Sequence, residues 1–180
     1  KGLHIASDTI LHLGINKQHD KLWAYNANSL YLYDKRQDKT KKMAHGMANI
    51  SEAHISDEFI YLISESGMLK AINVNTLSVM EVPMPEWVLT HISGQTPMLY
   101  VDGSGGLWVH TFQNSKLYYK RNQSTNWKEI TLSPDQNLFN RVRDITEDQN
   151  GNIWIITSHL GAFILKPGSE DIQHFTNNPF

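Results

Sequence analysis

Short apolar segments recur along the whole chain and are separated by residues that favour turns. Residues 30–33, 68–72 and 153–156 are runs of this kind, with Ser, Asp, Gly or Asn beside them. No segment keeps a 3.6-residue apolar period for three turns, and residues 52–54 and 136–139 could form one turn of helix at most. The pattern therefore predicts an all-β chain of many short strands.

One hairpin sequence occurs twice. Residues 102–108 and 148–154 share the pattern Asp-x-x-Gly-x-(Leu/Ile)-Trp, and their tryptophans stand 46 residues apart. Weaker copies lie near residues 20 and 57. The aromatic positions of the four copies, spaced by 38, 47 and 46 residues, are Trp23, Tyr61, Trp108 and Trp154. A period in this range is typical of repeat proteins in which each repeat forms one small sheet.

Small polar residues reinforce the repeat. Three positions after each aromatic residue stand, in turn, Asn26, Ser64, Thr111 and Thr157. In the two strong copies the aspartate side chain can accept backbone N–H bonds, while the glycine supplies a position with positive φ. The residues to which we assign this structural turn role are Asp102, Gly105, Asp148 and Gly151.

A repeat of about 40 to 47 residues with about four strands is the period of propeller blades. We therefore predict a β-propeller fragment of about four blades, each a four-stranded antiparallel sheet, extending over residues 1–180. The predicted repeats are 9–46, 47–87, 88–138 and 139–180, and residues 1–8 are expected to hold the outer strand of a preceding blade.

Residues 140–163 resemble a two-component regulator propeller repeat. That family's pattern runs Val-x-x-Ile-x-Glu-Asp, then Gly-x-Ile-Trp, then a Thr, then Gly-Leu or Gly-Gly-Leu, and the match of this segment is strong. The resemblance implies a periplasmic sensor segment of a hybrid two-component histidine kinase, as in gut bacteria of the Bacteroidetes type. Such segments usually sense carbohydrate, and a membrane helix joins them to the kinase.

Composition narrows the remaining choices. With 19% charged residues and a formal net charge of −2, a nucleic-acid partner is not favoured. Cysteine is absent, and no apolar run reaches the roughly 18 residues of a membrane span. The start has neither an initiating Met nor the apolar core of a signal peptide. We therefore expect a piece of a longer protein, and the resemblance implies that it is attached to a membrane only through downstream segments.

Candidate site residues are few. Trp23, Trp108 and Trp154 are expected in the core, whereas Trp87 and Trp127 fall outside the repeat register and are the better candidates for exposed ligand contacts. Nine histidines are scattered without the spacing of a metal site, so we predict no metal and no cofactor.

Three functions remain open. The first is a sensor or binding segment without catalysis. The second is a propeller glycoside hydrolase or lyase, for which Asp102 and Asp148 would be the acids, although their equivalent turn positions favour a structural role. The third is a protein-binding scaffold of the WD-repeat type. Because an open arc of blades exposes faces that a closed ring would bury, we also expect self-association.

Overall fold

The computed structural model describes residues 12–16, 21–56, 58–113, 116–132, 141–169 and 171–175. The chain divides into two compact units, Lys1–Met84 and Pro85–Phe180, each of which contains two four-stranded sheets.

The first unit holds two sheets made from consecutive strands. Its strands are β1 (His12–Asn16), β2 (Lys21–Asn26), β3 (Ser29–Asp34) and β4 (Lys39–Met43) in one sheet, and β5 (Ile50–Ile55), β6 (Phe59–Ser64), β7 (Leu69–Asn73) and β8 (Val79–Glu81) in the other.

The second unit begins with one short helix and continues with two further sheets. Its elements are α1 (Glu86–Ile92), then β9 (Pro97–Val101), β10 (Leu107–Thr111), β11 (Lys116–Lys120) and β12 (Trp127–Thr131), and finally β13 (Val142–Glu147), β14 (Ile153–Thr157), β15 (Ala162–Leu165) and β16 (Ile172–Phe175).

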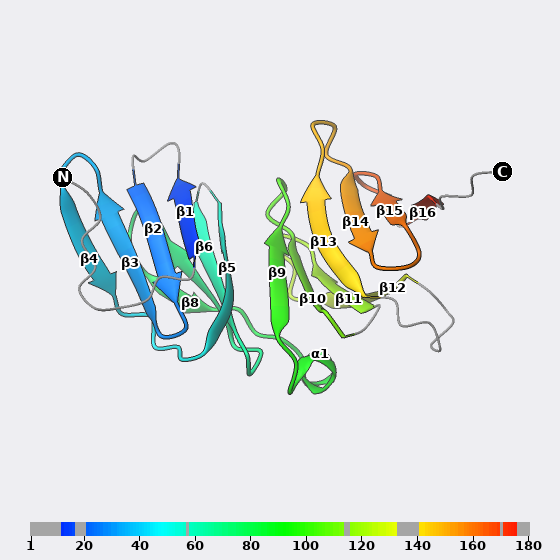
Figure 1. The fold of residues 1–180 in the computed structure, drawn as a ribbon, viewed down its shortest axis with the longest axis horizontal. Helices are drawn as coiled ribbons and strands as arrows, with labels where there is room; N and C mark the ends of the chain where they lie inside the picture. The colour runs from blue at the N-terminus through cyan, green and yellow to red at the C-terminus, as the bar shows by residue number, and fades with distance from the viewer. Residues whose placement is uncertain are drawn as a thin grey trace. The chain divides into compact units, whose positions relative to one another are not determined.

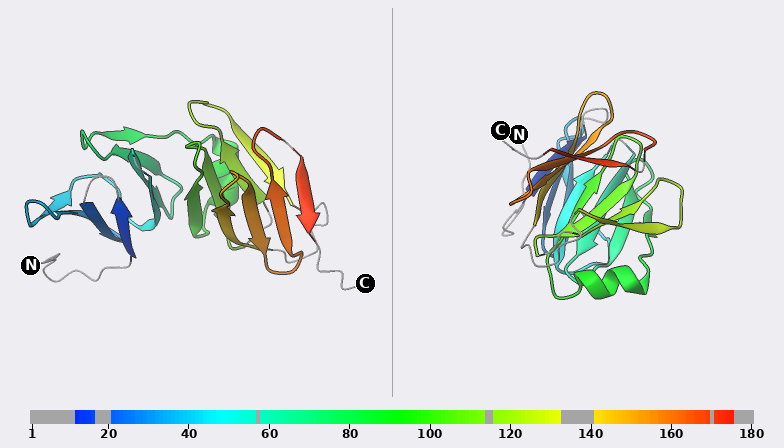
Figure 2. Two further views of the ribbon diagram at one scale, coloured as in Figure 1. Left: turned by 90° about the horizontal axis from the view of Figure 1, so that it is seen from above. Right: turned by 90° about the vertical axis from the view of Figure 1, so that its right-hand side faces the viewer.

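Within every sheet the strands lie side by side in chain order, and each pairs antiparallel with its neighbour (Figures 1 and 2). This arrangement confirms the predicted four-stranded antiparallel sheets, and it is the blade of a β-propeller. Each sheet falls inside one predicted repeat, but α1 crosses the boundary that was placed at residue 87. The strand expected in residues 1–8 lies outside the described residues.

The helix α1 differs from the sequence prediction. Its two buried residues, Val88 and Ile92, lie four positions apart, which is one helical repeat. So short a segment never shows the longer apolar period on which the prediction relied. Residues 52–54, where a helical turn was considered, belong to strand β5, and residues 136–139 lie outside the described part of the chain.

Burial changes from strand to strand within a sheet. Every residue of β10 is buried, whereas every residue of β8, at the edge of its own sheet, is exposed. An inner strand is covered by packing on both faces, so it tolerates apolar residues at consecutive positions. This is why the segments after the Asp-x-x-Gly turns are apolar without alternation.

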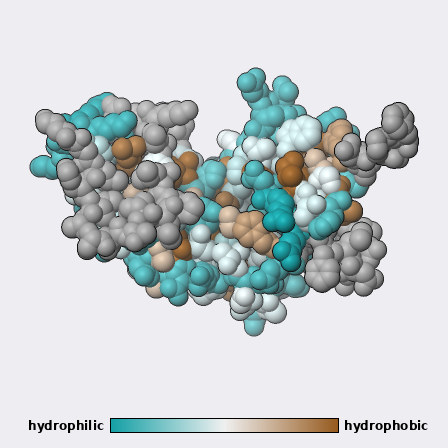
Figure 3. Space-filling model, in the orientation of Figure 1, coloured by the Kyte–Doolittle hydropathy of each residue, from teal (hydrophilic) through white to brown (hydrophobic). Residues whose placement is uncertain are grey.

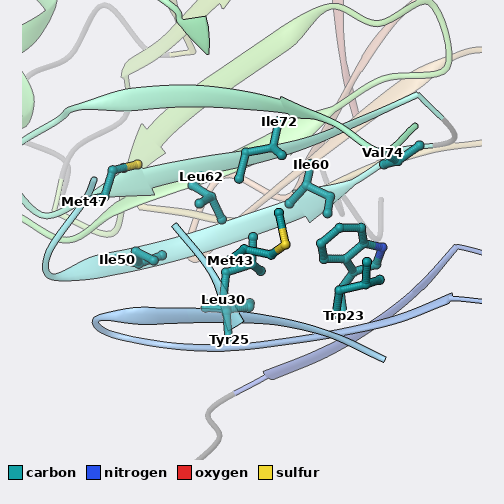
Figure 4. Packing of buried hydrophobic residues seen from close by; sticks show 11 residues of the cluster. Trp23, Tyr25, Leu30, Met43, Met47, Ile50, Ile60, Leu62, Ile72 and Val74 are labelled. Atoms are coloured by element: carbon teal, nitrogen blue, oxygen red, sulfur yellow. The ribbon is translucent and has the colours of Figure 1, made fainter. Parts of the chain in front are cut away.

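The core of the first unit lies between its two sheets. Trp23 and Met43 from the first sheet point toward Ile60, Leu62 and Ile72 of the second (Figure 4). Trp23 is fully buried. A buried aromatic side chain of this size contributes a large share of the apolar area that holds two sheets together.

The second unit has a core of the same kind. Trp108 and Leu117 of the third sheet pack with Ile153, Ile155 and Phe163 of the fourth. The two strong copies of the repeat therefore face one another across a shared apolar layer.

Some apolar side chains are left at the surface. In the fourth sheet Ile156 and Phe175 are 38% and 48% exposed, and the ring of Phe175 lies 5.6 Å from that of Trp154. On the face that Figure 3 shows, hydrophobic surface occurs as small separate areas among hydrophilic ones. Self-association through such a blade face stays a prediction.

The approach of β1 to β5 gives a test of the packing in the first unit. A methyl group built on Gly14 would stand 1.9 Å from Cδ1 of Ile55, so Gly14→Ala forces that side chain to move. We expect the free energy of unfolding to fall by about 1–3 kcal/mol, as overpacking usually costs.

Ile55→Val removes the clashing methyl group and should by itself cost about 0.5–1.5 kcal/mol. Urea denaturation of both single variants and the double variant should show that the double variant is more stable than the sum of the two effects allows. Additive effects would contradict the contact.

Candidate ligand-binding groove

The turn between β9 and β10 is organised by one carboxylate. Oδ1 of Asp102 accepts the backbone N–H groups of Ser104 at 3.0 Å and Gly106 at 2.8 Å, and Oδ2 accepts the indole N–H of Trp108 at 2.8 Å. The N–H of Gly105 donates to the Asp102 carbonyl at 2.8 Å, with φ at +82°. The carboxylate of Asp102 therefore joins the backbone of its own turn to the indole of the tryptophan six residues later.

The turn between β13 and β14 repeats this geometry. Oδ1 of Asp148 accepts the N–H groups of Asn150 at 2.9 Å and Asn152 at 3.0 Å, while Oδ2 accepts the indole N–H of Trp154 at 3.0 Å. Gly151 has φ at +78°. The bonds from Trp154 and Asn152 lower the pKa of Asp148 to about 2.

In the weaker copies the described residues make other contacts, and Asp20 and Asp57 lie outside the described part of the chain. The buried indole N–H of Trp23 has no hydrogen-bond acceptor among the described residues. The position that holds the aspartate in the strong copies, six residues before the tryptophan, is Lys17 here, and it lies outside the described residues. In the second sheet the hydroxyl of Ser56 closes the hairpin with two bonds to the backbone of Phe59, at 2.9 and 3.0 Å. Tyr61, at the aromatic position there, is only partly buried.

The small polar residues close the turn at the other end of the strand. Ser64 Oγ accepts the N–H of Met68 at 3.0 Å, and Thr157 Oγ1 donates to the carbonyl of Gly161 at 2.8 Å. Asn26 accepts the N–H of Asn28 at 3.0 Å. In the third sheet, Thr111 instead donates to the side chain of Gln95.

A groove lies between the third and fourth sheets, beside the Asp-x-x-Gly turns. It consists of two adjoining hollows of about 450 and 360 Å³, which share the lining residues Tyr119, Arg121, Leu165 and Ser169. Volumes of this size are typical of small-molecule sites. Both walls belong to the second unit, so the groove is a feature of that unit alone.

The groove has an aromatic and aliphatic floor. Tyr119 is paired across the strands with Trp108, and their ring centroids are 4.3 Å apart. Burial and the nearby charge of Asp102 raise the pKa of Tyr119, while a hydrogen bond from Arg121 opposes that change. Ile130 and Leu165 complete the apolar part.

The rim of the groove is polar. Asn122 donates from Nδ2 to the carbonyl of Ser104 at 2.8 Å, and the N–H of Gly103 donates to the carboxylate of Glu147. The second of these bonds joins the third sheet to the fourth. Ser124 and Asn126 add a hydroxyl and an amide to the smaller hollow.

The two tryptophans that the sequence offered as exposed ligand contacts have different surroundings. Trp87 is 41% exposed on α1, and its ring meets that of Tyr118 edge to face at 5.8 Å. Trp127 is buried, with 8% of its surface exposed. Neither lines the groove. The expected exposure of Trp127 is therefore wrong, and a ligand contact at Trp87 stays a prediction.

Sequence reasoning missed the residues that form the groove. Tyr119 lies in β11, but nothing in a run of two tyrosines tells which of them faces the next sheet. Arg121 and Lys166 come from hairpin turns, whose approach depends on how the sheets pack.

Within the described ranges, no three His, Asp or Glu side chains are grouped as a metal site requires, and no helix could span a membrane.

The fold defines a class of protein, the β-propellers, and solved structures agree. Virginiamycin B lyase from Staphylococcus aureus is 14% identical with a TM-score of 0.65, over 97% of this chain and 57% of that one. The extracellular domain of a protein assigned as a hybrid two-component system from B. thetaiotaomicron is 18% identical with a TM-score of 0.63, over 96% of this chain and 22% of that one. The WD40 propeller of Doa1 is 14% identical with a TM-score of 0.60, over 91% of this chain and 52% of that one.

One family model matches part of the last repeat. Residues 138–159 match the family model described as a two component regulator propeller, which confirms the resemblance seen in the sequence. No curated protein matches the chain. The chain spans little more than half of the lyase and about a fifth of the sensor domain.

The depressed pKa of Asp148 predicts a pH dependence of stability. Because its folded pKa of about 2 lies below the value of about 3.9 in an unfolded chain, the ionised carboxylate stabilises the fold above about pH 4. That contribution is lost as the pH falls through about 2. The difference in unfolding free energy between the natural protein and Asp148→Asn should therefore shrink between pH 5 and pH 2.

Chemical denaturation across this pH range measures the difference. Gln149→Ala is the matched control, because it changes an exposed residue of the same turn and no titrating group. A difference for Asp148→Asn that stays constant with pH would contradict the assignment.

Proposed function

We propose that this chain is part of the extracytoplasmic sensing region of a two-component regulator and that it binds carbohydrate without turnover. The observation that carries the proposal is the groove between two blades, one of which bears the regulator repeat. The likeness to the sensor domain from B. thetaiotaomicron supports the fold of such a region, and that domain is extracellular. Periplasmic location, as part of an inner-membrane sensor, belongs to the same proposal.

The groove suits a saccharide of one or two rings. Apolar floors bind the C–H faces of pyranose rings, and amide, hydroxyl and charged groups on a rim bind their hydroxyls. Tyr119 and Leu165 supply the first kind of contact, while Asn126 and Ser169 supply the second.

The carboxylates of the repeat are poor candidates for glycoside cleavage. A general acid must hold a proton near the working pH, whereas Asp148, with a pKa of about 2, is ionised there. Both carboxylate oxygens of Asp102 accept hydrogen bonds, from the turn and from Trp108, so this side chain holds the turn in place. The lyase neighbour, at 14% identity, shares the fold and gives no support for its activity here.

Signalling requires that a ligand bind two arrangements of the receptor with different affinity. A groove between blades meets this requirement in a simple way, because a ligand that touches both walls favours one spacing of the sheets. The bond from Gly103 to Glu147 already links the same two sheets. We propose that the signal passes to the kinase through segments outside this chain.

Isothermal titration calorimetry against a panel of oligosaccharides tests the proposal, together with an assay for released reducing ends. We expect binding of at least one saccharide and no release. Ser169→Trp places a large side chain where both hollows meet, and it should weaken binding at least tenfold.

Thr125→Trp is the control, since Thr125 is exposed and does not line the groove. Release of reducing ends would favour a hydrolase instead. Failure of every saccharide together with recovery of one protein partner would favour a scaffold.

A further inference from the structure

We infer that the groove selects an acidic saccharide, one that bears a carboxylate or sulfate group, through Arg121 and Lys166. The inference rests on the proposed function, because it specifies the ligand class of the same groove. The argument for an acidic ligand depends on which charged side chains of the groove lining already have partners within the protein.

The carboxylates of the lining are engaged by the protein itself. Glu129 is paired with Lys116 at 2.9 Å and is therefore neutralised. Asp102 is 8% exposed and accepts N–H groups from its own turn and from Trp108. Glu147 accepts the N–H of Gly103, so its carboxylate lies against the turn of the third sheet.

Among the described residues, two cations of the lining have no carboxylate partner. Arg121 follows β11 on one wall, Lys166 follows β15 on the other, and both line the larger hollow. The guanidinium of Arg121 bonds to the hydroxyl of Tyr119, which is uncharged. In the part of the chain that the structure describes, neither Arg121 nor Lys166 forms an ion pair. Each therefore keeps its charge for a ligand.

The positions of the two cations define what they can hold. Arg121 offers a planar fork of N–H donors, which matches the two oxygens of a carboxylate or sulfate. Lys166 acts as a compact point charge from the opposite wall. An anionic group that reaches both cations would be bound from both sheets, whereas a neutral sugar would form no ion pair with either. The groove thus distinguishes acidic from neutral saccharides by charge as well as by shape.

The hydrogen bond from Arg121 to Tyr119 restricts the orientation of the Arg121 guanidinium. It ties the guanidinium to the aromatic floor, so less conformational freedom is lost when a ligand binds. A sugar ring above Tyr119 would place a substituent near Arg121 without any rearrangement of the floor. Arg121 is therefore the specificity-determining residue, and Lys166 strengthens the same contact.

Titration calorimetry with three matched disaccharides tests the inference: a neutral one, its uronic-acid counterpart and a sulfated counterpart. We expect at least one acidic disaccharide to bind roughly tenfold or more tighter than the neutral one. Raising the salt from about 50 to about 500 mM should reduce that preference, because exposed charges are screened.

Arg121→Gln and Lys166→Gln should each weaken binding of the acidic ligand by roughly fivefold to twentyfold and weaken binding of the neutral ligand much less. Arg121→Lys should restore part of the loss, since it keeps the charge but not the fork. Lys41→Gln is the matched control, because it removes the same charge from an exposed position on β4, outside the groove.

Equal affinity for neutral and acidic disaccharides, or unchanged affinity in Arg121→Gln with an unchanged melting temperature, would overturn the inference while the proposed function stands. Failure of all saccharides to bind the natural protein would overturn both.

Discussion

The bond between a turn aspartate and the indole of the following strand is the constraint on which the second unit depends. A tryptophan buried between sheets contributes a large apolar area, but its N–H group must find an acceptor or its burial is costly. Asp102 supplies that acceptor at 2.8 Å and uses its other oxygen for the turn amides. One carboxylate therefore fixes the hairpin turn and the direction of the indole together.

The groove is a consequence of the same bond. Trp108, held by Asp102, packs against the tilted ring of Tyr119, and Tyr119 in turn accepts the hydrogen bond from Arg121. The repeat residues that give the blade its shape thus support the residues that would contact a ligand.

Much of this architecture could be predicted from the sequence. The Asp-x-x-Gly pattern gave the turn role of Asp148 and Gly151, and the period gave the number of sheets, because both depend on local chemistry. The helix α1 was missed, since two apolar residues one turn apart leave no long period to detect. Arg121 and Lys166 could not be found either, because their approach depends on the packing of two sheets.

The exchange of the Trp108 indole proton with solvent, followed by NMR, tests the central claim most directly. The account predicts slow exchange in the natural protein and much faster exchange in Asp102→Ala, while the indole proton of Trp154, held by Asp148, is unchanged. Equal exchange rates for Trp108 in the two proteins would contradict the claim that this carboxylate holds the blade and the groove above it.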